Sequence, residues 1–224
     1  MLIVEGHRIE TAAYGPSLAE TPTLVFLHEG LGYVSMWKEF LKRLSEITGS
    51  GTLIYSRLGS RRSGPSVLPR RVTFIHEEAS RLLPQILKQA GFQEHLLIGH
   101  SDGGSIALIY AGKNQRERLA GIITEAPHVF CGNGLVQSIT KVVRAYKDGG
   151  LREPLEKHHG ENIENASWGW ANVWQHLPFG FTLFEQTGQH KQGPLDRPAG
   201  RAEFGVHMLH PETDFGGGLR VSGQ

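Results

Sequence analysis

The stretch His95-Leu96-Leu97-Ile98-Gly99-His100-Ser101-Asp102-Gly103-Gly104 decides the fold of this chain. Its first four residues form a short apolar run typical of a buried strand, and the segment from Gly104 to about Ala111 has a helix-like composition. Between them, residues 99–103 read G-x-S-x-G, the pattern of a tight strand-to-helix turn that lifts a serine hydroxyl above a sheet. Small flanking residues permit the strained backbone of such a turn. The sequence therefore predicts that Ser101 is a nucleophile that attacks a carbonyl group.

Short apolar runs alternate with helical patterns along most of the chain, which predicts a mostly parallel sheet covered by helices. After an opening hairpin over residues 1–14, strands are expected at 23–27, 52–55, 95–98 and 119–124. Amphipathic helices are expected at 36–44 and 74–90, the second with a kink at Pro84. The turns that follow these strands then lie at the carboxyl edge of the sheet, where open parallel sheets bind ligands.

One of these turns, His28-Glu29-Gly30-Leu31-Gly32, supplies the second element of the chemistry. An acyl-transfer serine needs N–H donors aimed at the oxyanion that develops on the substrate. We expect one donor from the backbone of Asp102, directly after the serine, and the other from Gly30, with Leu31 as the alternative.

Composition limits the possible partners. The chain has 224 residues, of which 39% are hydrophobic, and a formal net charge of +1, which suits a globular core but gives no reason to expect nucleic acid or a charged membrane surface. The cluster Arg57, Arg61, Arg62, Arg70 and Arg71 is expected in a solvated loop. We expect a small-molecule substrate; the oligomeric state stays open.

The single cysteine, Cys131, forms no intrachain disulfide and gives no metal-binding spacing, so no metal is expected. The start of the chain lacks the pattern of a signal peptide, and no apolar stretch is long enough to cross a bilayer. These features predict a cytoplasmic protein.

From His28 to about Trp174 the chain resembles the α/β-hydrolase fold superfamily. Three motifs in family order carry the resemblance: the turn at 28–32, the elbow at 99–104, and residues 55–64, which are similar to a loop written D-x-R-G-x-G-x-S. In that loop Ser56 replaces the aspartate and Arg61 replaces a glycine. The resemblance implies hydrolysis of a small ester or related carbonyl compound, as in carboxylesterases, through an acyl-serine intermediate and without a cofactor.

Beyond residue 130 the pattern changes. Helical spacing at 135–146, 151–158 and 162–174 resembles the cap that such hydrolases carry over the active site, with His158 and His159 expected on a helix surface. Trp168 and Trp170 are expected either to line an apolar substrate pocket or to pack the cap core. We therefore expect a hydrolase core over 1–130, a cap-like segment over 131–178 and an irregular tail over 179–224.

The tail lacks the two strands on which the family carries its acid and its histidine. Residues 185–224 are rich in glycine and proline, and only 179–184 and 205–210 could form short strands. This predicts an incomplete α/β-hydrolase fold, truncated or altered after about residue 178.

The loss of those strands leaves the acid and the base to be found elsewhere. Glu125, just past a strand, is the candidate acid, with a solvated loop carboxylate as the alternative, and Asp196 and Asp214 have no support. The base stays open among His28, His128, His190, His207 and His210. Two functions follow: an active serine hydrolase, or a catalytically incompetent hydrolase-fold protein that serves as a binding module.

Overall fold

The computed structural model describes residues 1–91, 94–113, 118–129, 132–177 and 208–209. Its main sheet has the strand order β3-β5-β4-β6-β7-β8. The strands are β3 (Thr11–Tyr14), β4 (Thr23–Leu27), β5 (Gly51–Tyr55), β6 (His95–His100), β7 (Leu119–Glu125) and β8 (Met208–Leu209). Only β3 is antiparallel to its neighbour, β5, so the predicted mostly parallel sheet is confirmed.

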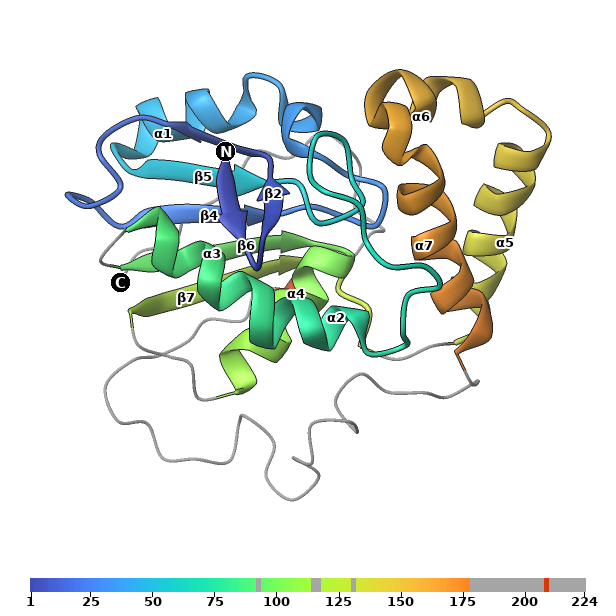
Figure 1. The fold of residues 1–224 in the computed structure, drawn as a ribbon. Coiled ribbons are helices and arrows are strands. Elements are labelled where there is room, and N and C mark those ends of the chain that lie inside the picture. Colours follow the sequence, from blue (N-terminus) through green and yellow to red (C-terminus); the bar gives the residue numbers. More distant parts are fainter. Residues whose placement is uncertain (92–93, 114–117, 130–131, 178–207, 210–224) are drawn as a thin grey trace.

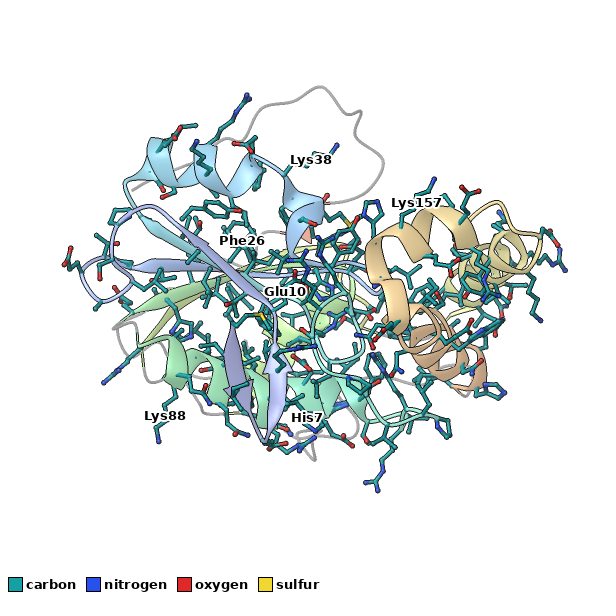
Figure 2. The ribbon with its side chains drawn as sticks, turned by 45° about the horizontal axis from the view of Figure 1, so that its top comes forward. His7, Glu10, Phe26, Lys38, Lys88 and Lys157 are labelled. Atoms are coloured by element: carbon teal, nitrogen blue, oxygen red, sulfur yellow. The ribbon has the colours of Figure 1, made fainter. Side chains whose placement is uncertain are left out.

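Helices cover both faces of this sheet (Figure 1). One face carries the 3-10 helix η1 (Val34–Trp37) and α1 (Phe40–Thr48); Figure 2 shows Phe26 of β4 between the sheet and α1, where it packs with Leu41 and Ile54. The opposite face carries α2 (Phe74–Glu77), α3 (Leu83–Ala90) and α4 (Asp102–Gly112). The larger apolar core fills the space between these helices and the sheet. Burial of apolar surface on both faces explains why β4 and β5 read as continuous apolar runs.

Two elements differ in detail from the sequence prediction. The opening hairpin consists of β1 (Leu2–Val4) and β2 (His7–Ile9), and the chain leaves it at Glu10 to enter the main sheet as β3. The helix expected at 74–90 contains a π-helical segment, η2 (Glu78–Leu82), directly before Pro84. Because a proline has no N–H and its ring clashes with the preceding turn, the wider turn of η2 accommodates Pro84 near the start of α3; the kink expected at this position stays a prediction.

The helices α5 (Asn133–Lys147), α6 (Arg152–His159) and α7 (Ile163–His176) stand together beside the sheet, at the end toward which its parallel strands point (Figure 1). A short 3-10 segment, η3 (Gly160–Asn162), links α6 to α7. This arrangement places the three helices over the loops that carry the predicted site.

Of the predicted tail, only the two-residue strand β8 lies within the described residues, where it extends the sheet beyond β7. The possible strand at 179–184 and the remaining tail lie outside them. No helix in the described part of the chain is long and apolar enough to span a membrane.

Candidate active site

Ser101 occupies a strained turn between β6 and α4. Its φ of 54° lies in the left-handed region that non-glycine residues rarely adopt, and its N–H donates to the carbonyl of Glu125 at the end of β7 (2.8 Å). A Cβ on Gly103 would lie 2.0 Å from the carbonyl oxygen of Leu27, and one on Gly99 would lie 2.3 Å from that of Gly103. The glycines of the elbow are thus required because backbone packs on backbone, and they let the elbow sit against the end of β4.

The structure brings His128 to this serine. Ser101 Oγ and His128 Nε2 lie 2.8 Å apart, a hydrogen-bond distance. His128 follows β7 after Ala126, whose φ of 45° is also left-handed, and Pro127, so the chain turns sharply back toward the elbow. Of the two candidate histidines that the structure describes, His28 and His128, it is His128 that lies within reach of the hydroxyl.

His128 is held by two neighbours that sequence reasoning missed in this role. The hydroxyl of Ser105, one turn into α4, accepts the His128 N–H (2.9 Å) and donates to the His128 carbonyl (2.8 Å). The indole of Trp174 packs edge-on against the imidazole, with ring centroids 5.1 Å apart. Both residues are buried. No local pattern marks Ser105, because its partner lies 23 residues further along the chain.

The electrostatics of the pair are set by burial and by one carboxylate. Burial lowers the pKa of His128, which keeps the imidazole neutral and able to accept a proton. Asp102 Oδ1 lies 4.0 Å from His128 Nε2 and opposes that shift. Asp102 is itself fully buried, which raises the pKa of its carboxyl group, while Arg57 Nη2 at 3.7 Å acts in the opposite sense. Asp102 therefore places a buried carboxyl group, with Arg57 beside it, next to the candidate base.

The turn after β4 has the geometry expected of an oxyanion site. The Gly32 N–H donates to the carbonyl of Glu29 (3.1 Å), which makes Gly30 and Leu31 the two central residues of a β-turn. Within the described residues neither of their N–H groups has an acceptor, and the N–H of Asp102 is likewise free at the start of α4. The two turns follow neighbouring strands, since Leu27 pairs with Gly99.

Gly30 also has no room for a side chain. A Cβ at this position would lie 2.0 Å from Nε1 of Trp170 on α7. Trp168 and Trp170 line a small cavity of about 10 Å³ between the oxyanion turn and α5, together with Leu31, Val143 and Tyr146. Helix α7 thus reaches the predicted oxyanion donor through the indole of Trp170.

The other acid and base candidates lie elsewhere. The carboxyl group of Glu125 is exposed, and within the described residues no hydrogen bond or ion pair joins it to His128; its assignment as the acid stays a prediction. His28 is buried behind the oxyanion turn. The candidates His190, His207, His210, Asp196 and Asp214 fall outside the described residues.

The arginine cluster is more buried than expected. Arg57 is 4% exposed and lies behind the turn that follows β4, whereas Arg70 is half-buried and donates through Nη2 to the carbonyl of Leu58 (2.7 Å). The expectation of a solvated loop is therefore wrong for Arg57. His159 is also buried, not on a helix surface: it donates through Nε2 to the carbonyl of Leu31 (3.1 Å). Both corrections have one cause, namely the many carbonyl groups of this loop region that need donors once the cap covers them.

In the loop at residues 55–64, the two residues that depart from the family pattern, Ser56 and Arg61, share one hydrogen-bond partner. Glu10, which Figure 2 shows in the interior, accepts hydrogen bonds from Ser56 Oγ (2.7 Å) and Arg61 Nε (3.1 Å). Arg61 has a φ of 47°, in the left-handed region that favours glycine. The carboxylate expected at position 56 is thus supplied by Glu10 from the neighbouring segment, and Arg61 pairs with it.

Comparisons with known proteins agree with this geometry. The family model described as the alpha/beta hydrolase fold matches residues 22–204. Among solved structures, the chain is similar to a carboxylesterase structure from Nitrososphaera gargenis (15% identity, 80% of this chain and 72% of that chain covered, TM-score 0.62). It is also similar to an alpha/beta hydrolase fold protein from Chitinophaga pinensis (15%, 80% and 72%, TM-score 0.59).

A third solved structure, the enol-lactonase from Burkholderia xenovorans, has 13% identity, coverage of 77% of this chain and 71% of that chain, and a TM-score of 0.56. No curated protein sequence gives a significant match. At these identities the solved structures show the fold, and the family model covers most of the sequence. With a family model that matches residues 22–204, a mostly parallel sheet and a strand-to-helix elbow, this chain belongs to the α/β-hydrolase fold family.

Proposed function

We propose that this chain is a serine hydrolase of small esters or related carbonyl compounds, with Ser101 as nucleophile and His128 as general base. The observation that carries the proposal is the 2.8 Å separation of Ser101 Oγ and His128 Nε2 on a strained elbow. A serine hydroxyl becomes an effective nucleophile when an adjacent base accepts its proton.

The reaction follows from the positions of these groups. Ser101 Oγ attacks the carbonyl carbon while its proton moves to His128 Nε2, and the oxyanion accepts N–H groups from Asp102 and from Gly30 or Leu31. The imidazolium then gives the proton to the leaving alkoxide, which departs as an alcohol and leaves an acyl-serine. Water, deprotonated by His128, attacks the acyl carbon; the bond from that carbon to Ser101 Oγ then breaks, His128 returns the proton to Oγ, and the carboxylic acid leaves. This chemistry uses no cofactor.

The acid of this arrangement acts without a hydrogen bond. The carboxylate of Asp102 lies 4.0 Å from the nitrogen that gains the proton, so it stabilises the imidazolium by charge alone. This differs from the usual triad, in which the acid bonds the other ring nitrogen and fixes the tautomer. Here His128 is oriented by two other residues: Ser105 hydrogen-bonds its backbone, and Trp174 packs against its ring.

The proposed substrate class rests on the cap and on the similar structures. Apolar and aromatic side chains, including Trp168 and Trp170, surround the cavity beside the turn after β4; its volume of about 10 Å³ is that of about one water molecule, so it supports an apolar surface near the site and no acyl pocket of a given size. Two of the similar structures are named a carboxylesterase and an enol-lactonase, and both names denote hydrolysis of an ester bond.

The test is labelling by a fluorophosphonate together with turnover of p-nitrophenyl acetate. Ser101→Ala is expected to abolish both, and His128→Gln to reduce kcat by about 100-fold or more, because a general base contributes roughly 100- to 10,000-fold. His176→Gln, which changes an exposed histidine at the end of α7, is the matched control and should behave as the wild type.

Each other result has a distinct meaning. No labelling of the wild type would refute the nucleophile. Labelling without turnover would favour the incompetent binding module. Full turnover by His128→Gln would show that His128 is not the base. The base would then be His190, His207 or His210, and Glu125 would be the acid.

A further inference from the structure

We infer that Arg57 is a positioning residue that, with His28, fixes the orientation of the oxyanion turn. The inference deepens the proposed function and rests on it, because it concerns the N–H donor of the same site. The evidence is the set of hydrogen bonds that converge on the carbonyl groups of residues 28 and 29 from behind the turn.

The carbonyl of Glu29 accepts three hydrogen bonds: from Gly32 N (3.1 Å), from Arg57 Nη2 (2.8 Å) and from His28 Nδ1 (2.6 Å). The other arm of the same guanidinium, Arg57 Nη1, donates to the carbonyl of His28 (2.7 Å). The planar fork of an arginine thus holds two successive peptide groups at once, which a single ammonium group could not do in the same way.

His28 is locked in the tautomer that this arrangement needs. Its Nε2 accepts the backbone N–H of Arg57 (3.0 Å), so the ring proton is on Nδ1, where it donates to Glu29. Complete burial and the nearby charge of Arg57 hold the pKa of His28 well below its usual value. The ring therefore stays neutral, and the hydrogen bond to the turn persists across the pH range in which a hydrolase works.

These contacts determine where the Gly30 N–H points. In a trans peptide the C=O of one residue and the N–H of the next point in opposite directions. Because the Glu29 carbonyl is held on the side of Arg57 and His28, the Gly30 N–H is directed away from them. Within the described residues it has no acceptor, so it is available to an oxyanion.

The cap restrains the turn on its other side. His159 Nε2 donates to the carbonyl of Leu31 (3.1 Å), and its Nδ1 accepts the backbone N–H of Arg61 (3.2 Å). With residues 28, 29 and 31 all held at their carbonyl oxygens, the turn cannot rotate its peptide planes without breaking several buried hydrogen bonds. Such preorganised donors are the most effective in stabilising a transition state.

A role of Arg57 solely as the counter-ion of Asp102 accounts for less of the structure. The closest approach of the two groups is 3.7 Å, and both oxygens of Asp102 lack a hydrogen-bond partner among the described residues. The two directed hydrogen bonds of the guanidinium go to the turn instead. These two hydrogen bonds indicate that Arg57 orients the peptide groups of the turn.

The experiment compares Arg57→Met and Arg57→Lys with Arg70→Lys. Arg70 is the matched control, because it is a half-buried arginine of the same region whose hydrogen bonds go to Leu58 and Ser66 and not to residues 28–32. Loss of one oxyanion donor costs about 100- to 1,000-fold in kcat. We expect Arg57→Met to lose that factor with little change in KM, Arg57→Lys to lose less, and Arg70→Lys to keep the wild-type kcat.

Affinity for a boronic acid, which forms a tetrahedral adduct with Ser101, should fall in parallel with kcat for the Arg57 variants. Equal kcat and equal boronate affinity in Arg57→Met and wild type would overturn the inference. So would losses of the same size in Arg70→Lys, because they would indicate a general structural effect.

A crystal structure of each Arg57 variant gives a readout that does not depend on activity. We expect the Glu29–Gly30 peptide to rotate or to take more than one orientation, and an unchanged peptide would overturn the inference. Failure of the wild type to label with a fluorophosphonate would instead refute the proposed function, while the crystal structures would still decide the role of Arg57. If Arg57→Met does not fold, Arg57→Lys carries both measurements.

Discussion

Ser105→Ala is expected to lower both the stability and the activity of this protein. Ser105 is 1% exposed, and its hydroxyl accepts the N–H of His128 (2.9 Å) and donates to the carbonyl of His128 (2.8 Å). Alanine leaves the buried N–H without an acceptor, which costs about 1–3 kcal/mol, and removes a hydrogen bond worth about 1 kcal/mol. The sum is about 2–4 kcal/mol.

For a protein of this size each kcal/mol corresponds to about 2–4 °C in Tm, so we expect a fall in Tm of about 4–16 °C. The activity should fall further than this loss of stability explains. When Ser105 no longer holds its backbone, His128 is free to shift relative to Ser101, and a misplacement of about 1 Å costs about 100-fold in rate.

The control is Ser45→Ala. Ser45 is 2% exposed, and its hydroxyl donates to the carbonyl of Ser50 (2.6 Å), on α1 and far from the elbow. It should lose about 1 kcal/mol of stability and none of the activity. The measurements are thermal unfolding and kcat/KM for p-nitrophenyl acetate. The reasoning is refuted if Ser105→Ala is destabilised as expected but keeps the kcat/KM of Ser45→Ala.

Three further substitutions test the remaining parts of the site. Asp102→Asn removes the charge that raises the pKa of His128. The acidic limb of the pH profile of kcat/KM should therefore move to lower pH, and the plateau value of kcat/KM should fall about 10-fold. An acidic limb at the wild-type pH would contradict the electrostatic role of Asp102. Gly30→Ala places a Cβ 2.0 Å from an indole nitrogen, which should cost about 1–3 kcal/mol and most of the activity, whereas Gly134→Ala, with open space around its Cβ, should retain both in the same assays. At Arg61, with a φ of 47°, alanine should be about 1–2 kcal/mol less stable than glycine in denaturant unfolding, and equal stabilities would show that no backbone strain is present.

Much of the fold could be predicted from local patterns. The strands β4, β5, β6 and β7 each follow an apolar run bounded by turn residues, and the glycines of the elbow signal a close backbone approach. The opening hairpin was harder to delimit, because nothing in the sequence of Thr11–Tyr14 shows that it pairs with β5. Pairing between distant strands depends on tertiary contacts that no local window contains.

The candidate site likewise has one part that local sequence predicts and another that depends on tertiary contacts. Ser101, Gly30, Leu31 and Asp102 could be named as candidates because their roles depend on turns that are themselves local. The hydrogen bonds by which Arg57, His28 and His159 hold the turn could not be foreseen, since they join the segments after β5 and β4 to α6. The bonded residues are 29 and 128 positions apart in the sequence.

Local sequence alone is enough to predict a strand-to-helix elbow and a glycine-containing turn after β4, because glycine spacing and apolar runs act over a few residues. Which histidine meets Ser101 depends instead on tertiary contacts. His128 reaches the hydroxyl because parallel pairing aligns the ends of β6 and β7, and because Ser105 and Trp174 then hold the loop that follows β7. A residue type and its spacing state what chemistry a side chain can perform, whereas the distance between two side chains is set by the packing of the elements that carry them.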